Sequence, residues 1–179
     1  MLALCAEFAE HGPFHVFRPY NDLRFAKNRP PYKTAQAAIA EGEGGSGYYV
    51  QLAADSMMAA AGYYVMARDQ LQRFRAAVDA DGTGEEVVTL VDELAAAGYQ
   101  IAAHDELKTA PRGFARDHPR IALLRRGGSM ASRSWPIAPW MHTVAAVDKV
   151  GEAWAGTAAM CGWLDAHVGP STMAPDERH

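Results

Sequence analysis

The chain has 179 residues, of which 49% are hydrophobic and 21% charged, and its formal net charge is −4. This size and composition are typical of one globular domain, and they exclude a disordered chain and a fibrous repeat. The sequence has neither the roughly 18 consecutive apolar residues of a membrane helix nor the residue order of a signal peptide. We therefore expect a soluble cytoplasmic protein without membrane contact, with one domain over residues 1–170 and a flexible tail over residues 171–179.

The first eleven residues place Leu4 and Phe8 on one apolar stripe, which predicts a helix that ends at Gly12-Pro13. Position 1 would then lie inside a helix without an N-cap, so we expect that a preceding segment is missing. Its absence would leave an apolar groove around Leu4 and Phe8. We expect a partner subunit to fill this groove in a homo-oligomer, or the groove to remain a weak point.

Residues 14–20 alternate between apolar and polar side chains and predict an edge strand that Pro19 limits. It leads into the most unusual part of the chain, the basic stretch of residues 18–33, with a net charge of +4. This stretch contains the cations Arg18, Arg24, Lys27, Arg29 and Lys33, the anion Asp22 and the aromatic residues Tyr20, Phe25 and Tyr32. We expect most of it to be a loop, because each proline of Pro30-Pro31 forces the preceding residue into an extended conformation.

Residues 42–47 fit the spacing G-x-G-x-x-G of a dinucleotide-binding loop. Such a loop must open a helix that receives the pyrophosphate, whereas the residues that follow here predict a strand. Kinase signatures that would suit a glycine loop between two strands are also missing. We therefore interpret residues 42–47 as a flexible connector.

The repeated sequences Gly47–Val50 and Gly62–Val65 predict two antiparallel strands around a turn at Asp55-Ser56. We expect residues 48–53 to pair with residues 57–64 in this hairpin. The small residues 59–62 make the second strand almost bare, so a helix is expected to pack closely on it.

Further along, helical spacing predicts a helix over residues 68–78 and a second one that Thr83 and Glu86 begin as a capping box and Gly98 ends. A short strand is expected at residues 99–103. Residues 107–114 repeat the basic and aromatic character of the first stretch in an irregular loop, and residues 108–126 carry a net charge of +5.

Asp117 is expected to cap a short helix over residues 118–126, and residues 129–135 predict another strand. The chain from Trp140 to Gly169-Pro170 is expected to be mostly helical. Because the tight turn at Asp55-Ser56 permits only antiparallel neighbours, the fold class that we predict is α+β: an antiparallel sheet with helices packed on it.

The common catalytic signatures, such as H-E-x-x-H, G-x-S-x-G and the Walker A loop, are absent from the sequence. Its histidines are scattered, and we expect neither a metal site nor a cofactor. Cys5 and Cys161 have no partner at ligand spacing, which predicts two buried free thiols.

Two basic stretches in an otherwise acidic chain suggest a positive patch that binds anions, although two separate solvated faces explain the charge pattern equally well. We expect the stretches to converge on a concave face of the sheet near Tyr49 or Tyr64. The candidate ligand residues are Arg18, Tyr20, Arg24, Lys27, Lys33, Tyr49, Lys108 and Arg112. Asp22 is a weak candidate for a catalytic base. The ligand would be an anionic small molecule that carries a phosphate or a carboxylate.

Two alternatives to this ligand site remain. A nucleic-acid-binding module would use the same cations and aromatic rings, although the overall acidity argues mildly against it. In a scaffold or interaction protein, the arginines would be paired internally and would serve only the fold.

Residues 18–33 resemble the signature R-x-Y-R-D-x-R-F-S-K-D-K-x-P-Y-K of a family of conserved hypothetical proteins, domain of unknown function 2461. Later blocks of this family are similar, in the same order, to Gly47–Leu52, Leu107–Phe114, Asp117-His118-Pro119 and Ala131–Ser134. The resemblance covers about residues 1–170. The family has no established activity, so the resemblance implies where a site lies and leaves its chemistry open.

This chain departs from the family signature at four positions. Asn21 replaces an arginine, Ala26 a serine, Asn28 an aspartate and Arg29 a lysine. If the site of the family is catalytic, these changes would weaken it. Similar proteins also begin with a helical segment that contains an N-N-x-x-W-F-like motif, which this chain lacks, in agreement with the uncapped start at Met1.

Overall fold

Six antiparallel strands form one sheet in the computed structural model, which describes residues 1–21, 30–42 and 44–173. The strand order is β1-β2-β3-β4-β6-β5. The strands are β1 (His15–Val16), β2 (Ala35–Glu41), β3 (Gly47–Ala53), β4 (Ser56–Tyr63), β5 (Gln100–Ala102) and β6 (Ser129–Pro136). The predicted α+β class with an antiparallel sheet is confirmed.

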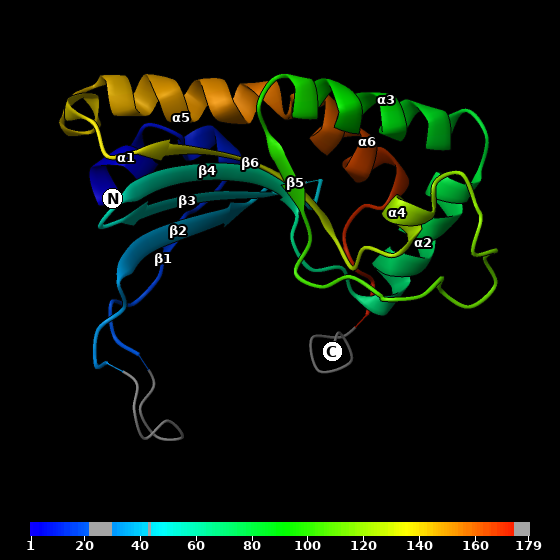
Figure 1. Ribbon diagram of the computed structural model, residues 1–179. Helices are drawn as coiled ribbons and strands as arrows, with labels where there is room; N and C mark the ends of the chain where they lie inside the picture. The colour runs from blue at the N-terminus through cyan, green and yellow to red at the C-terminus, as the bar shows by residue number, and fades with distance from the viewer. Residues whose placement is uncertain (22–29, 43, 174–179) are drawn as a thin grey trace.

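Helices α5 and α6 lie over one face of this sheet, and the opposite face of β1–β3 carries no helix of the described residues (Figure 1). The α-helices are α1 (Leu2–Ala6), α2 (Arg68–Asp79), α3 (Thr83–Ala96), α4 (Ile121–Leu124), α5 (Ala145–Gly156) and α6 (Ala158–His167), and two short 3-10 helices are η1 (Ala9–His11) and η2 (Pro139–His142). The core fills the side that faces the helices, where Val50 and Val150 are fully buried. The period of two along β3 therefore leaves Tyr49 and Gln51 on the uncovered face.

The predicted hairpin is confirmed, since β3 and β4 are antiparallel and pair Gly47 with Gly62 and Tyr49 with Ala60. The repeat is not paired over its whole length, because β4 ends at Tyr63. Tyr64 and Val65 lie beyond the strand and are exposed.

The bare strand β4 carries the close helix packing that its small residues predict. Ala59 and Ala61 are buried, and the indole N–H of Trp154 on α5 donates to the Ala60 carbonyl at 3.0 Å. A larger side chain at these positions would hold the helices away from the sheet.

Strand β2 is an element for which we had no prediction from the sequence. Its residues, Ala35–Glu41, are rich in alanine, the residue with the highest intrinsic helix propensity. The strand forms because β3 pairs with it along its whole length and β1 pairs with part of its other side. Tertiary pairing thus overrides local propensity here.

The N-terminal segment is not one helix, because α1 ends at Ala6 and η1 follows it. Met1 is the N-cap residue of α1 rather than a residue inside the helix. Phe8 is buried, with its ring 4.8 Å from that of Trp154 in an edge-on contact. The chain itself therefore encloses Phe8, so the predicted apolar groove is not found around this residue, and the oligomeric state stays a prediction.

Three other boundaries differ from those expected. The strand predicted over residues 14–20 is reduced to His15–Val16. Helix α3 has Gly82 as its N-cap, and the Thr83 hydroxyl donates to the Ala77 carbonyl, so the predicted capping box is not formed. Helix α4 begins at Ile121 after Arg120, without a side-chain cap from Asp117.

The connector of residues 42–47 leads from strand β2 into strand β3, not into a helix, as the prediction against a dinucleotide-binding loop requires. Cys5 and Cys161 are both buried and free, as predicted. In the segment expected to be a tail, the Ser171 hydroxyl and the Thr172 amide donate to the Asp69 carboxylate at 2.8 and 2.9 Å. Residues 174–179 lie outside the described part of the chain.

Replacing Gly62 with alanine is expected to destabilise the fold by about 2 kcal/mol or more. Gly62 has φ +128°, and a Cβ atom there would lie 2.4 Å from the Ser129 carbonyl oxygen of the neighbouring strand. Gly98 also has a positive φ, of +86°, but has nothing within 4 Å of a Cβ position. Gly98→Ala is therefore the matched control for backbone strain alone and should cost about 1 kcal/mol. Denaturant unfolding measures both, and equal losses would contradict the packing of β4 against β6.

Candidate ligand-binding site

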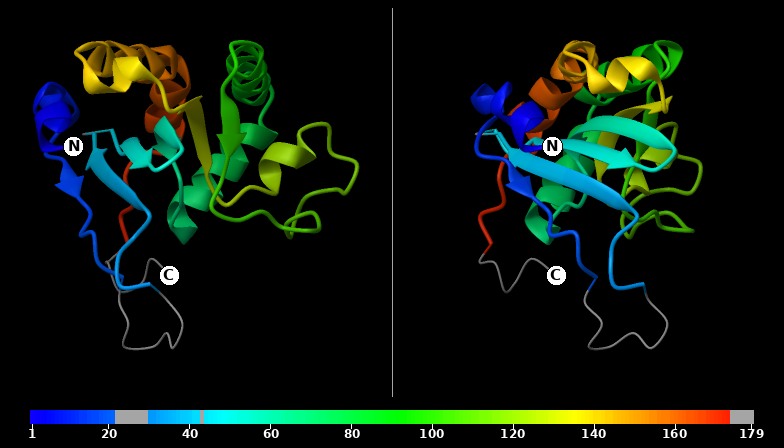
Figure 2. Two further views of the ribbon diagram at one scale, coloured as in Figure 1. Left: turned by 60° about the vertical axis from the view of Figure 1, so that its left-hand side comes forward. Right: turned by 90° about the vertical axis from the view of Figure 1, so that its left-hand side faces the viewer.

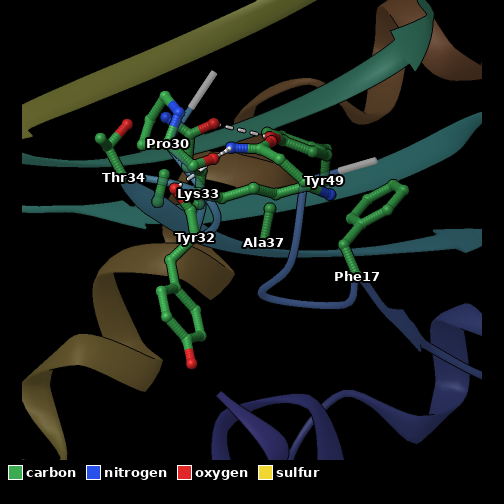
Figure 3. A pocket seen from close by; sticks show the side chains of 10 residues that line it. Phe17, Pro30, Tyr32, Lys33, Thr34, Ala37 and Tyr49 are labelled. Carbon is green, nitrogen blue, oxygen red and sulfur yellow. Dashed lines mark hydrogen bonds between the residues drawn. The ribbon is translucent and has the colours of Figure 1, made fainter. Parts of the chain in front are cut away.

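A pocket of about 470 Å³ lies at the β1–β2–β3 edge, on the sheet face that no described helix covers (Figure 3). The residues that line it are Phe17, Asn21, Pro30, Tyr32, Lys33, Thr34, Ala35, Ala37, Tyr49 and Gln51. The strand register explains why they meet. Ala37 of β2 lies opposite Gln51 of β3, and Tyr49 is two residues from Gln51 on the same face.

Tyr49 and Gln51 form a hydrogen-bonded pair on the sheet surface that the pocket exposes. The Tyr49 hydroxyl donates to Oε1 of Gln51 at 2.7 Å. Among the described residues, the side-chain N–H groups of Gln51 have no acceptor, so they can donate to a ligand. Burial raises the pKa of Tyr49, and the nearby Tyr64 hydroxyl raises it further. Tyr49 is thus a neutral hydrogen-bonding group near neutral pH rather than a phenolate base.

Lys33 brings a positive charge into the same pocket. Its ammonium nitrogen lies 5.4 Å from the centre of the Phe17 ring, within the range of a cation–π interaction. The Phe17 ring is in turn 6.5 Å from the Tyr49 ring. Figure 3 shows Phe17 and Tyr49 on the same side of the pocket, whereas the Tyr32 ring points away from them.

Asn21 joins the two ends of the basic stretch where they leave the sheet. Its side-chain N–H₂ group donates to the carbonyls of Pro30 at 2.8 Å and Tyr32 at 3.1 Å. Its backbone N–H donates to the Pro31 carbonyl, and the Lys33 N–H donates to the Pro19 carbonyl. This short ladder continues the pairing of β1 and β2, and it fixes the backbone from which Lys33 extends.

The structure brings together only part of the predicted site. Lys33 and Tyr49 line the pocket, whereas Arg18 and Tyr20 are exposed beside it and do not line it. Asp22, Arg24 and Lys27 lie outside the described residues, as do the family departures at residues 26, 28 and 29.

Among the described residues, the expected convergence of the two basic stretches is not found. Lys108 and Arg112 lie in the loop that follows β5, at the edge of the sheet opposite to β1. Figures 1 and 2 show residues 18–21 and 30–33 on a different side of the molecule from residues 103–118. Both residues are exposed, and neither lines the pocket that contains Lys33. Their part in ligand binding stays a prediction.

Among the lining residues that were not predicted as ligand residues are Phe17, Asn21 and Gln51. Gln51 could have been found, because a residue two positions from Tyr49 in a strand shares its face. Phe17 and Asn21 depend on the pairing of β1 with β2, and the alanine-rich sequence of β2 gave no sign of that pairing.

The described lining supplies a cation, hydrogen-bonding side chains and aromatic rings, which are groups that can hold a ligand. It contains neither a carboxylate nor an imidazole. Among the described residues, no three His, Cys, Asp or Glu side chains gather closely enough to hold a metal ion.

Replacing Asn21 with aspartate should weaken the hydrogen-bonded ladder between residues 19–21 and 30–33. The new side chain has the same size but cannot donate to the Pro30 and Tyr32 carbonyls. We expect the amides of Asn21 and Lys33 to exchange their hydrogens about fivefold faster, for a loss of about 1 kcal/mol of local stability. Exchange measured by NMR, with the Val50 amide in the core as the internal control, checks this. Unchanged exchange at Lys33 would show that Asn21 does not hold the ladder.

Tyr49 should also make stability fall at alkaline pH. In the unfolded chain its hydroxyl ionises near pH 10, whereas burial keeps it protonated to a higher pH in the folded chain. The contribution of Tyr49 to the free energy of unfolding is therefore complete below about pH 10 and is lost as the pH rises further. Urea unfolding at several alkaline pH values should show a shallower decline for Tyr49→Phe than for the parent chain. Parallel declines would mean that Tyr49 titrates alike in both states.

Comparison with known proteins identifies the family. The family model described as conserved hypothetical protein (DUF2461) matches residues 4–163. No curated protein and no solved structure matches the chain. Within the described residues, every helix is too short or too polar to cross a membrane. The family match covers most of the sequence and includes the basic stretch, the hairpin and strand β6, and so the chain belongs to the DUF2461 family of conserved hypothetical proteins.

Proposed function

We propose that this protein binds a small molecule in which a phosphate or carboxylate group lies next to a ring, in the pocket at the β1–β2–β3 edge. The observation that carries the proposal is the ammonium group of Lys33 held over the Phe17 ring, beside the Tyr49–Gln51 pair. A pocket of about 470 Å³ suits a ligand of metabolite size.

Each part of the ligand has a partner in the pocket. The Lys33 ammonium is a compact charge with three donors and can bind either a phosphate or a carboxylate. The side-chain N–H groups of Gln51 can donate to a second oxygen of the same anion. The rings of Phe17 and Tyr49 offer apolar faces on which a planar part of the ligand can stack.

Whether the site also catalyses a reaction depends on residues beyond the described lining. Asp22 is the candidate base from the sequence, and it lies outside the described residues. The described residues by themselves support a binding protein.

A second candidate function is the binding of single-stranded nucleic acid. Tyr20 and Tyr32 form an isolated β-bridge, and their side chains are 60% and 61% exposed, with ring centres 5.5 Å apart. Exposed tyrosines next to cations are typical of surfaces on which bases stack. The net charge of −4 opposes this function. Affinity for an oligonucleotide that falls steeply with salt would support it, because many phosphates would be neutralised.

The proposed site predicts that phenyl phosphate stabilises the protein through Lys33. At about 100 times its dissociation constant, the ligand should raise the free energy of unfolding by about 2.7 kcal/mol, which appears as a higher melting temperature. Lys33→Met should abolish most of this gain, because the charge that binds the phosphate is lost.

Lys149→Met is the matched control for this experiment. Lys149 also lies over an aromatic ring, with its ammonium 5.5 Å from the centre of the Trp140 ring, but it is remote from the pocket lining. This variant should keep the full stabilisation by phenyl phosphate. No stabilisation of the parent chain by phenyl phosphate, inorganic phosphate or benzoate would contradict the proposal, and so would an equal loss in both variants.

A further inference from the structure

A second cavity, of about 420 Å³, is lined by residues of α3, α5 and α6 and by Tyr99 and Arg133. Figure 1 shows these three helices on the covered side of the sheet. Tyr99 and Arg133 line it from the sheet side. Arg133 belongs to the block Ala131–Ser134, which resembles the family and which the pocket of Lys33 does not use. Its neighbour across the ladder is Ala59, one of the buried residues on the face that the helices cover.

Arg133 is held in place but keeps most of its donors. Its guanidinium carbon lies 5.3 Å from the centre of the Tyr99 ring, and the Tyr99 hydroxyl donates to the Ala153 carbonyl at 2.9 Å. One guanidinium N–H donates to the carbonyl of Ala97, the C-cap residue of α3, at a long 3.3 Å. Arginine has five N–H donors, and within the described chain this is the one hydrogen bond found for the Arg133 side chain.

The walls of the cavity carry the opposite charge. Glu93 comes from α3 and Glu152 from α5, and both are exposed at the cavity. Among the described residues, neither carboxylate forms an ion pair with Arg133 within 4.0 Å. The apolar part of the lining comes from Leu90, which is half-buried, and from Leu94 and Met160, which are buried.

We propose that this cavity binds an α-amino acid with an apolar side chain. The carboxylate of the amino acid pairs with the guanidinium of Arg133, which matches its planar geometry. The ammonium group lies toward Glu93 and Glu152, and the side chain packs on Leu90, with Leu94 and Met160 beneath it. A polyanion would be repelled by the two glutamates, and a simple amine would leave the donors of Arg133 unused. The inference does not depend on the pocket of Lys33, because the two sites lie on opposite faces of the sheet.

Isothermal titration calorimetry with L-leucine tests the ligand class. We expect L-leucine to bind the parent chain. Isopentylamine, which lacks the carboxylate, and isocaproate, which lacks the ammonium group, should each bind at least about tenfold more weakly. The side-chain Nε–H resonance of Arg133 locates the ligand, because it should shift when L-leucine is added. An arginine that only caps α3 and stacks on Tyr99 predicts no heat and no shift.

Substitutions test the contacts. Arg133→Met should weaken L-leucine binding at least about tenfold, whereas Arg68→Met, at an exposed arginine on α2, is the matched control and should leave it unchanged. Glu152→Gln should weaken L-leucine but not isocaproate. Ala159→Phe fills the cavity from α6 without touching the Arg133 hydrogen bond, so it keeps the experiment decisive if Arg133→Met fails to fold. The proposal is overturned if L-leucine does not bind the parent chain, or if Ala159→Phe binds it as tightly.

Discussion

Helices α5 and α6 lie close to the centre of the sheet because the middle of β4 presents only alanine side chains to them. Its central residues Ala59, Ala60 and Ala61 are all buried, and the Trp154 indole reaches the backbone of Ala60. The helices lie on the face of Ala59 and Ala61, where Val50 of β3 is also buried. Once Val50 of β3 points to the helices, the alternation of a strand turns Tyr49 and Gln51 to the uncovered face. The helices packed on β4 thus leave the opposite face of β2 and β3 free for the pocket of Lys33, although no β4 residue is among the described lining residues.

The glycine-rich connector owes its composition to packing rather than to phosphate binding. Oδ1 of Asp165 on α6 accepts hydrogen bonds from the Ser46 amide, the Ser46 hydroxyl and the Tyr63 hydroxyl, at 3.0, 2.8 and 3.0 Å. A Cβ atom at Gly44 would lie 2.3 Å from Oδ2 of Asp165, and one at Gly45 would lie 2.4 Å from the Tyr63 hydroxyl. At Gly44 and Gly45 the connector lies so close to Asp165 and Tyr63 that a side chain at either position would clash. A spacing that imitates a nucleotide-binding loop thus arises from a buried polar anchor that ties the β2–β3 connection to the C-terminal helix.

Much of the fold could be predicted because its signals are local. The repeated Gly-Tyr-Tyr-Val sequences and a tight turn predicted the β3–β4 hairpin, and the spacing of Leu71, Phe74 and Val78 predicted α2. Strand β2 could not be predicted, because alanine carries no strand signal and the strand exists through its neighbours. The same reason limited the site. Lys33 and Tyr49 were named from residue type alone, whereas Asn21 contributes through hydrogen bonds to Pro30 and Tyr32 that only the folded loop creates. The predicted convergence of the two basic stretches is not found among the described residues, because charge composition contains no information on strand order.

Both cavities use a cation held against an aromatic ring, yet the two cations suit different surroundings. Lys33 is exposed on Phe17, where a hydrated point charge can exchange water for an anion at little cost. Arg133 is half-buried on Tyr99, where a guanidinium, which is more weakly hydrated, loses less on leaving water. The strands that supply Tyr49 and Arg133 flank β4 on either side, and their side chains project to opposite faces. Among the described residues, none lines both cavities, so a substitution in one lining leaves the contacts of the other lining in place.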